Sequence, residues 1–249
     1  MKEFNYHDTA KQIGWNFSNI KNKVEYKHDY NYYRKVVENI TPQTVMLDIG
    51  CGSGEKSIRY YSLAKKVVML DIENEMLKKA KANRQKYYGS KYNSKFNFIL
   101  ADGDGKLDFK DESFDLVVSR HCGANMREVY RVLKKGGIFI SEDIDDKDCI
   151  ALKECFNRGQ AYGNKEDLKV TILNECVKAG FSTIELKNME EIEYYPEIEG
   201  LEYLLGYTPI INGYDEVNDR KTLEKYCEQN ATKKGVKLVR KLFAFYLVK

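Results

Sequence analysis

A glycine-rich segment follows directly after a short apolar run, and it constrains this chain more than any other feature. Residues 45–47 read V-M-L, and residues 48–54 read D-I-G-C-G-S-G. The apolar run predicts a buried strand, and the glycines allow a sharp turn where the backbone can approach a ligand closely. A helix is expected to begin near Ser53 and to run through Ile58 and Leu63, with its first N–H groups free for an anionic ligand group. The segment therefore predicts a strand–turn–helix unit that binds a small molecule.

The spacing of the glycines narrows the class of ligand. A nicotinamide or flavin site requires G-x-G-x-x-G, and its third glycine would fall on Glu55. In this chain the third glycine is Gly54, which gives D-x-G-x-G-x-G with an acid two residues before Gly50. That pattern resembles motif I of the class I S-adenosylmethionine-dependent methyltransferases. The cofactor that this resemblance implies is S-adenosyl-L-methionine rather than NAD.

A second apolar run ends in an acid, as the next strand of such a unit should. Residues 66–70 read K-V-V-M-L and are followed by Asp71. An acid at the tip of the second strand can accept hydrogen bonds from both ribose hydroxyls of an adenosine ligand. Ile72 and Met76 come next, and they are placed to offer apolar surface to the adenine ring.

A third apolar run, residues 96–100, leads into Ala101, Asp102 and Gly103. Asp102 resembles the family residue that accepts a hydrogen bond from the adenine amino group. Asp104 is a competing candidate for the same role, because it follows the strand almost as closely.

Two later segments resemble further motifs of the family. Residues 107–115 read L-D-F-K-D-E-S-F-D before a fourth apolar run, and residues 128–140 read E-V-Y-R-V-L-K-K-G-G-I-F-I. Together with the glycine loop and the two acids, these segments occur in the family's order over residues 40–145. The resemblance implies an α/β fold, a three-layer Rossmann-like sandwich with a seven-stranded, mostly parallel sheet whose last strand is antiparallel.

The resemblance also implies roles for residues at the carboxyl ends of the strands, where open α/β sheets bind their ligands. Asp48 is expected to orient the loop or to reach the methionine amine of the cofactor through water. A side chain at Gly50 or Gly52 is expected to collide with the cofactor. The full set of expected cofactor-binding residues is Asp48, Gly50, Cys51, Gly52, Asp71, Ile72, Met76, Asp102, Gly103 and Arg120.

Arg120, His121 and Cys122 follow the fourth apolar run. His121 can act as a general base, because an imidazole accepts a proton near neutral pH. It can equally pack under the methionine part of the cofactor as a structural residue, and both interpretations stay open. Glu142 and Asp143, after the fifth strand, are further candidates for a proton acceptor.

The same segment bears on the methyl acceptor. Enzymes that methylate the exocyclic amines of DNA or RNA bases usually carry [D/N/S]-P-P-[Y/F] there, whereas residues 119–121 read S-R-H and no proline follows. The R-H step and the helix after it resemble the broad methyltransferase domain 11 group, which contains small-molecule enzymes. The resemblance therefore favours a small-molecule acceptor.

The remaining segments are expected to complete a single methyltransferase domain over residues 1–249. Residues 1–40 are expected to form an N-terminal helical lead, and residues 41–188 the cofactor-binding core. Residues 189–235, rich in tyrosine and turn residues, are interpreted as an insert on the substrate side, and residues 236–249 as the final strand. An amphipathic helix is expected over residues 165–178.

Charge and cysteine content argue against several kinds of binding site. The chain has 41 Lys and Arg against 38 Asp and Glu, and a net charge of +3 is too balanced to indicate nucleic-acid binding by itself. The basic segment 78–95 is interpreted as a solvated helix face rather than an RNA-binding patch. Six scattered cysteines without a C-x-x-C pair indicate no metal site and fit reduced thiols in the cytoplasm. No apolar run approaches the length of a membrane span.

These observations predict an S-adenosylmethionine-dependent methyltransferase that transfers a methyl group to an O, N, C or S atom of a small-molecule acceptor. Two alternatives stay open: an RNA methyltransferase, and a non-catalytic protein that binds the cofactor without turnover. No membrane partner is expected.

Overall fold

The structure is a computed structural model that describes residues 4–249. The chain divides into two compact units. Unit 1 contains the described residues up to Asp29 together with Ile144–Leu168 and Asn188–Leu242, and unit 2 contains Tyr30–Asp143, Lys169–Lys187 and Phe243–Lys249. The expected N-terminal lead and substrate-side insert therefore contribute most of their residues to the same unit.

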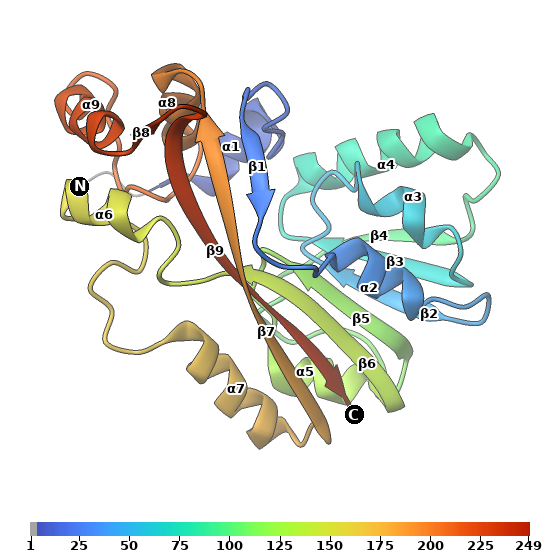
Figure 1. The fold of residues 1–249 in the computed structure, drawn as a ribbon. Helices are drawn as coiled ribbons and strands as arrows, with labels where there is room; N and C mark the ends of the chain where they lie inside the picture. The colour runs from blue at the N-terminus through green and yellow to red at the C-terminus, as the bar shows by residue number, and fades with distance from the viewer. Residues whose placement is uncertain (1–3) are drawn as a thin grey trace. The chain divides into compact units, whose positions relative to one another are not determined.

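Unit 2 holds the parallel part of the sheet (Figure 1). Its strands follow the order β6–β5–β2–β3–β4, and each neighbouring pair is parallel. The strands are β2 (Val45–Ile49), β3 (Lys66–Asp71), β4 (Phe96–Leu100), β5 (Phe114–Arg120) and β6 (Leu133–Ile144). The helices are α2 (Tyr32–Glu38), α3 (Ser57–Tyr61), α4 (Asn74–Tyr88), α5 (Met126–Val132) and α7 (Leu168–Ala179).

Alternation along the strands divides the core of unit 2 into two layers. In β2, Met46 packs in a cluster with residues of α2, α3 and α4, whereas Leu47 and Ile49 pack in a second cluster with residues of α5 and α7. Successive side chains of a strand point to opposite faces, so an apolar run of this kind is buried on both sides. The three-layer α/β sandwich expected from the sequence is confirmed.

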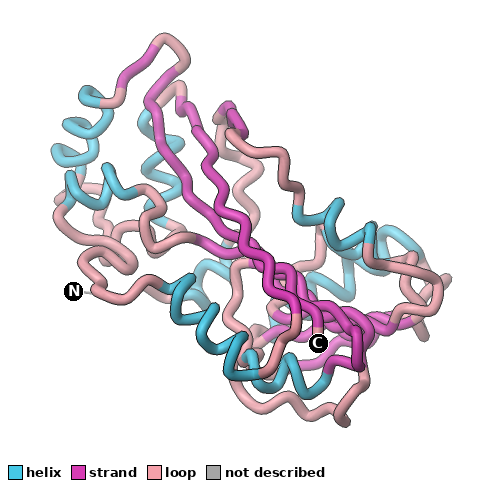
Figure 2. The backbone as a smooth tube through the Cα atoms, turned by 60° about the horizontal axis from the view of Figure 1, so that its bottom comes forward, coloured by secondary structure: helices cyan, strands magenta, loops and turns pink. Residues whose placement is uncertain are grey.

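The end of the chain is antiparallel to its neighbours, as expected. The N–H of Ser182 donates to the carbonyl of Val248, and the N–H of Lys249 donates to the carbonyl of Gly137. The last residues of β9 (Gly235–Val248) thus lie beside the first residues of β7 (Thr183–Tyr195) and of β6. Figure 2 shows β7 and β9 running side by side as long strands.

The expected number of strands is wrong, because residues 4–249 contain nine strands rather than seven. The additional strands are β1 (Lys23–Tyr26), which pairs antiparallel with β7, and the two-residue β8 (Ala231–Thr232), which pairs with β9. Both belong to unit 1, where β7 continues to Tyr195 and so includes the first residues of the segment expected to be an insert.

Unit 1 has a hydrophobic core of its own. Its helices are α1 (Tyr6–Gln12), α6 (Ile150–Phe156), α8 (Ile198–Gly206) and α9 (Arg220–Gln229). Buried residues of α6, α8 and α9 pack with Tyr195 and Leu238, and Phe17 of the N-terminal segment packs against the same cluster. The substrate-side role of residues 189–235 stays a prediction.

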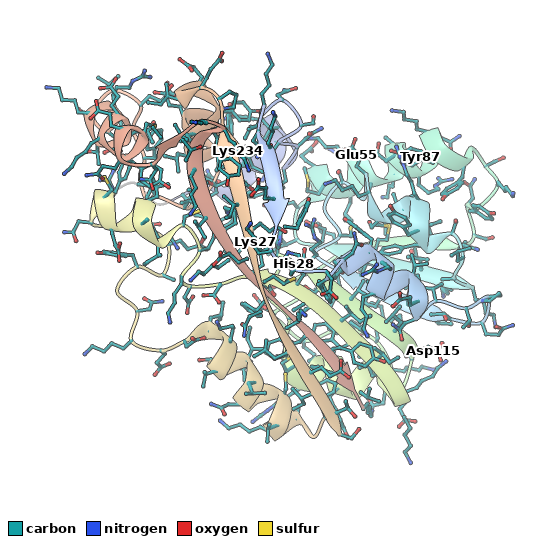
Figure 3. All side chains as sticks on the ribbon, viewed as in Figure 1. Lys27, His28, Glu55, Tyr87, Asp115 and Lys234 are labelled. Atoms are coloured by element: carbon teal, nitrogen blue, oxygen red, sulfur yellow. The ribbon has the colours of Figure 1, made fainter. Side chains whose placement is uncertain are left out.

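Two local features of unit 2 concern the segments that resemble family motifs. Helix α3 begins at Ser57 rather than near Ser53, because Gly52 and Gly54 have positive φ angles that extend the turn. Asp115 of the S-F-D motif, labelled in Figure 3, accepts from the N–H of Val45 at 2.8 Å and from Lys134 Nζ at 2.7 Å. It therefore joins the amino ends of β2, β5 and β6 and has a structural role.

Within residues 4–249, none of the helices combines the length and the apolar composition that crossing a membrane requires.

Candidate active site

The glycine-rich segment forms a tight turn between β2 and α3. Gly50, Gly52 and Gly54 have φ angles of +67°, +55° and +60°, which residues with a Cβ atom rarely adopt. The N–H of Cys51 donates to the carbonyl of Leu70 at 2.9 Å, so the turn is attached to β3. The predicted strand–turn–helix unit is present.

The three glycines meet different surroundings. An ideal Cβ on Gly50 would lie 2.4 Å from the Sγ atom of Cys122, and one on Gly54 would lie 2.7 Å from Cδ1 of Ile58. At Gly52 such an atom would have no neighbour within 4 Å. Packing within the protein therefore explains Gly50 and Gly54, whereas only Gly52 faces open space that a ligand can fill.

This difference gives a prediction for two alanine variants. Gly52→Ala should cost about 1 kcal/mol of stability, because only the positive φ opposes it, yet should lower affinity for S-adenosylhomocysteine at least about tenfold. Gly50→Ala should lower the melting temperature more, because its Cβ meets Cys122. Thermal unfolding without ligand and calorimetric titration measure the two effects. Wild-type affinity in Gly52→Ala would contradict the assignment of this space.

Asp71 ends β3 and holds the glycine turn directly. Its Oδ2 accepts from the N–H of Gly52 at 2.7 Å, and its Oδ1 accepts from the N–H of Glu73 at 2.8 Å. Each carboxylate oxygen has a second lone pair, so both can still accept a hydrogen bond from a ligand hydroxyl. Burial raises the pKa of Asp71, and the two backbone donors oppose this rise.

Asp48 lies on the face of β2 that packs against α2 and α3. It is two residues from Met46, so the pleat directs both side chains to the same layer. Tyr61 of α3 forms a hydrogen bond with the carboxyl group, and burial raises the pKa of Asp48 to about 8. At neutral pH the buried carboxyl group is therefore mostly protonated, and a nearby ligand cation would favour its ionised form.

Arg120 is the last residue of β5, and Glu142 is its register partner in β6, two residues before the end of that strand. Arg120 Nε donates to Glu142 Oε1 at 2.7 Å, and the guanidinium lies 5.6 Å from the ring centroid of Tyr33. Because Glu142 is paired with Arg120, its carboxylate is better suited to positioning Arg120 than to accepting a proton from a substrate. Asp48 pairs with Val118, two residues before Arg120, so the side chains of Asp48 and Arg120 lie on the same face of the sheet.

Tyr32 is a candidate site residue that does not stand out in the sequence. It opens α2, its side chain is 4% exposed, and its hydroxyl has no hydrogen-bond partner in the protein. The centroid of its ring lies 5.9 Å from the guanidinium of Arg120, and the carboxyl group of Asp48 acts on it electrostatically. The sequence predicts a helical lead in this region, but nothing in it indicates a buried hydroxyl without a partner.

His121 directly follows β5 in a left-handed conformation, with φ of +54°. Its N–H donates to the carbonyl of Glu142 at 2.8 Å, and its Nε2 lies 3.8 Å from Glu142 Oε1. The side chain is 38% exposed, so the imidazole reaches solvent. A non-glycine residue in this conformation is uncommon and is often found at functional sites.

The residues expected around adenine differ in exposure. Ile72 is 64% exposed and offers the predicted apolar surface, whereas Met76 is 1% exposed and packs inside the protein. Asp102 is exposed, and its Oδ1 accepts from the N–H of Asp104 at 2.9 Å. Gly103 is buried, and a Cβ there would lie 2.3 Å from Cγ2 of Ile49.

Cys51 lies in the glycine turn, Cys122 lies against Gly50, and Asp143 is the residue before the last one of β6. Burial, followed by repulsion from the neighbouring carboxylates, raises the pKa of the Cys122 thiol to about 12. Burial, followed by repulsion from Glu142 and Asp104, raises the pKa of Asp143 to about 8. Both groups are therefore protonated near neutral pH, and neither thiol is a ready nucleophile.

The donors and acceptors present fit the ligand implied by the glycine pattern. Asp71 keeps lone pairs for two hydroxyls, Asp48 can face an ammonium group, and open space lies beside Gly52. The hydroxyl of Tyr32, which has no hydrogen-bond partner, belongs to the helical layer on the same side of β2 as Asp48.

The chain is similar to known proteins at two levels. The sequence profile of a family described as "Methyltransferase domain" matches residues 40–195. A demethylmenaquinone methyltransferase of Leptospira interrogans is 27% identical over 152 residues, which cover 52% of this chain and 59% of that relative. The chain thus spans about three-fifths of the length of this curated relative.

Solved structures share the fold. The YcgJ protein of a Bacillus species superimposes with a TM-score of 0.59 at 15% identity, over 88% of this chain and 97% of that one. A phosphoethanolamine N-methyltransferase of Haemonchus contortus, solved with phosphomonomethylethanolamine and S-adenosylhomocysteine, gives a TM-score of 0.55 at 18% identity. That match covers 99% of this chain and 61% of the other.

Proposed function

This chain belongs to the methyltransferase-domain family, and we propose that it transfers a methyl group from S-adenosylmethionine to a small-molecule acceptor. The observation that carries the proposal is the link between the glycine turn and Asp71. The carboxylate that should receive the ribose hydroxyls also fixes the N–H of Gly52, beside the open space for the ligand. The carboxylate of Asp71 thus fixes the conformation of the loop and also binds the nucleoside.

The bound cofactor would supply an electrophilic methyl group on a sulfonium, which is already a good leaving group. The contribution of the protein is then alignment of acceptor and methyl, with water excluded. Asp71 and the glycine turn orient the nucleoside, and Asp48 holds the ammonium group. His121, exposed at the end of β5, is the candidate to accept a proton from an O–H or N–H acceptor.

The contacts made by charged side chains of the basic segment 78–95 favour a small-molecule acceptor over RNA. Lys91 and Lys95 lie over the ring of Tyr92, and Lys78 pairs with Glu75. Arg59 donates to the hydroxyl of Tyr87, labelled in Figure 3, so the aromatic rings are also engaged. A surface whose cations and rings bind one another is a poor platform for RNA, which requires free cations and stacking faces.

The names of the relatives point in the same direction. The Leptospira protein is named for demethylmenaquinone, and a protein of Synechocystis that is 28% identical over 137 residues is named for 2-methyl-6-phytyl-1,4-hydroquinone. Both acceptors are small molecules, and we extend only that class to this chain.

The proposed function is tested by incubating the protein with methyl-labelled S-adenosylmethionine and fractionated cell extract. Label is expected in the small-molecule fraction, and digestion with ribonuclease should not remove the signal. Label in RNA would select the nucleic-acid alternative.

Calorimetry should show S-adenosylhomocysteine binding at micromolar order without NAD binding, and tight binding of NAD alone would overturn the proposal. Binding with no labelled product in any fraction would indicate the non-catalytic alternative.

Asp48 gives a pH prediction for cofactor binding. Because the pKa of Asp48 is raised to about 8, the free protein carries a proton there at pH 7, and a ligand ammonium should expel it. Affinity for S-adenosylhomocysteine should therefore rise from pH 6 to pH 7.5, by up to about tenfold per pH unit. Binding enthalpies in buffers of different ionisation enthalpy count the protons released.

Two variants identify the group that loses this proton. Asp48→Asn should abolish the release, whereas Asp143→Asn should leave it unchanged, although the pKa of Asp143 is also raised to about 8. Proton release that persists in Asp48→Asn would show that Asp48 does not face the ammonium group.

A further inference from the structure

The hydroxyl of Tyr32 is buried and has no hydrogen-bond partner. Burying an unpaired hydroxyl costs free energy unless a ligand supplies the missing hydrogen bond. The side chain of Tyr32 is 4% exposed, and the hydroxyl oxygen is buried without a hydrogen bond. A buried polar group that remains unpaired costs roughly 1–3 kcal/mol. Two neighbouring tyrosines of this layer are bonded, Tyr61 to Asp48 and Tyr33 to Arg120.

The groups around Tyr32 determine which kind of ligand atom it can meet. Burial raises its pKa well above the usual range, and the nearby carboxyl groups of Asp48 and Glu142 raise it further. The hydroxyl therefore keeps its proton and is a neutral donor. Arg120 adds a positive charge 5.9 Å from the centroid of the ring. A donor beside a fixed cation favours an anionic acceptor.

Strand register fixes the place of this donor relative to the other ligand-binding groups. Asp48 is paired with Val118, two residues before Arg120 in β5, and Arg120 is paired with Glu142 in β6. Asp48, Arg120 and Glu142 therefore face the same helical layer, in which Tyr32 also packs. The layer presents an acid, which suits an ammonium group, beside a cation and a free hydroxyl donor, which suit a carboxylate.

We propose that the Tyr32 hydroxyl, assisted by the charge of Arg120, binds the carboxylate of the amino-acid end of the cofactor. This inference rests on the proposed function and deepens it. Glu142 acts as a positioning residue, because its 2.7 Å contact holds Nε of Arg120 and directs the rest of the guanidinium. The consequence is selectivity: ligands that lack the carboxylate bind more weakly, even when they keep the adenosine and the amine.

The test compares two ligands on wild-type protein and on Tyr32→Phe. S-adenosylhomocysteine carries the carboxylate, and its decarboxylated analogue S-adenosyl-3-thiopropylamine keeps the adenosine and the amine. In calorimetry, Tyr32→Phe should lower affinity for S-adenosylhomocysteine about tenfold. Affinity for the decarboxylated analogue should stay within about twofold of wild type, so the preference for the carboxylate shrinks.

The stability of the free protein provides a readout that is independent of binding. Because Tyr32→Phe removes a hydroxyl that has no partner, the melting temperature without ligand should be unchanged or higher. Tyr88→Phe is the matched control, since the Tyr88 hydroxyl donates to the carbonyls of Ile58 and Arg59 at 3.2 and 3.1 Å. This control should melt at a lower temperature and bind both ligands as the wild type does.

The outcomes separate this inference from the proposed function. An equal loss for both ligands in Tyr32→Phe would mean that the hydroxyl supports the nucleoside or the loop, and unchanged affinity for both would mean that it binds nothing. Either result overturns the inference while leaving the cofactor in place. Failure of the wild-type protein to bind S-adenosylhomocysteine would instead overturn the proposed function.

Discussion

Replacing Asp71 with alanine should lower affinity for S-adenosylhomocysteine about 100-fold. The variant loses acceptors for two ribose hydroxyls, and a hydrogen bond to a charged group contributes roughly 1.5–3 kcal/mol. It also releases the N–H groups of Gly52 and Glu73, which both oxygens of the carboxylate now hold. The ligand would then meet a glycine turn that is no longer fixed in place. Calorimetric titration measures the loss.

Two variants separate ligand binding from loop support. Asp71→Asn keeps an acceptor and the size of the side chain, so its loss should be smaller than that of Asp71→Ala. Asp102→Ala should also cost less, because Asp102 is exposed and its expected partner is a single amino group. Melting temperatures measured without ligand show how much of each effect arises from the fold. Wild-type affinity in a folded Asp71→Ala protein would show that the nucleoside lies elsewhere.

The parallel core could be predicted from the sequence because its signals are local. Strands β2, β3 and β5 each contain three or more consecutive apolar residues, as is typical of strands buried on both faces. The turn after β2 is marked by glycines, and the acid after β3 follows at the spacing of a βαβ unit. These features require no knowledge of distant contacts.

The segments that build unit 1 could not be predicted in the same way. Strand β1 is only Lys23–Tyr26, and its pairing with residues 191–194 of β7 joins segments far apart in sequence. Strand β7 alternates irregularly over Thr183–Tyr195, with many exposed residues in its first half, so its continuation was interpreted as an insert. Short edge strands are stabilised by tertiary pairing more than by their own propensity.

The candidate site residues also differ in whether the sequence could predict them. Asp48, Asp71 and Arg120 end apolar strands, so their place at the carboxyl edge follows from sequence. Tyr32 comes from a helix whose residues read as core, and its missing partner is visible only in three dimensions. Glu142 was considered as a base, but its register with Arg120 gives it a structural partner.

Replacing His121 with asparagine should lower turnover at least about 100-fold while affinity for S-adenosylhomocysteine changes less than about threefold. General-base catalysis contributes roughly 10²–10⁴-fold, and an amide cannot accept the proton. Asparagine is the informative replacement, because it tolerates the left-handed conformation that His121 adopts at φ +54°. Turnover is measured with the acceptor that the labelling experiment identifies.

His121→Ala separates the two interpretations of this residue. Alanine adds backbone strain at the same position, so a structural role predicts that His121→Ala loses stability and cofactor affinity while His121→Asn keeps both. A catalytic role predicts equal loss of turnover in the two variants, because neither side chain carries a base. Full turnover in His121→Asn would leave the imidazole with a packing role. It would also mean that the acceptor atom reacts without a base at the end of β5, as a carbon or a thiolate sulfur can. The 3.8 Å approach of Nε2 to Glu142 would then serve only to fix the turn.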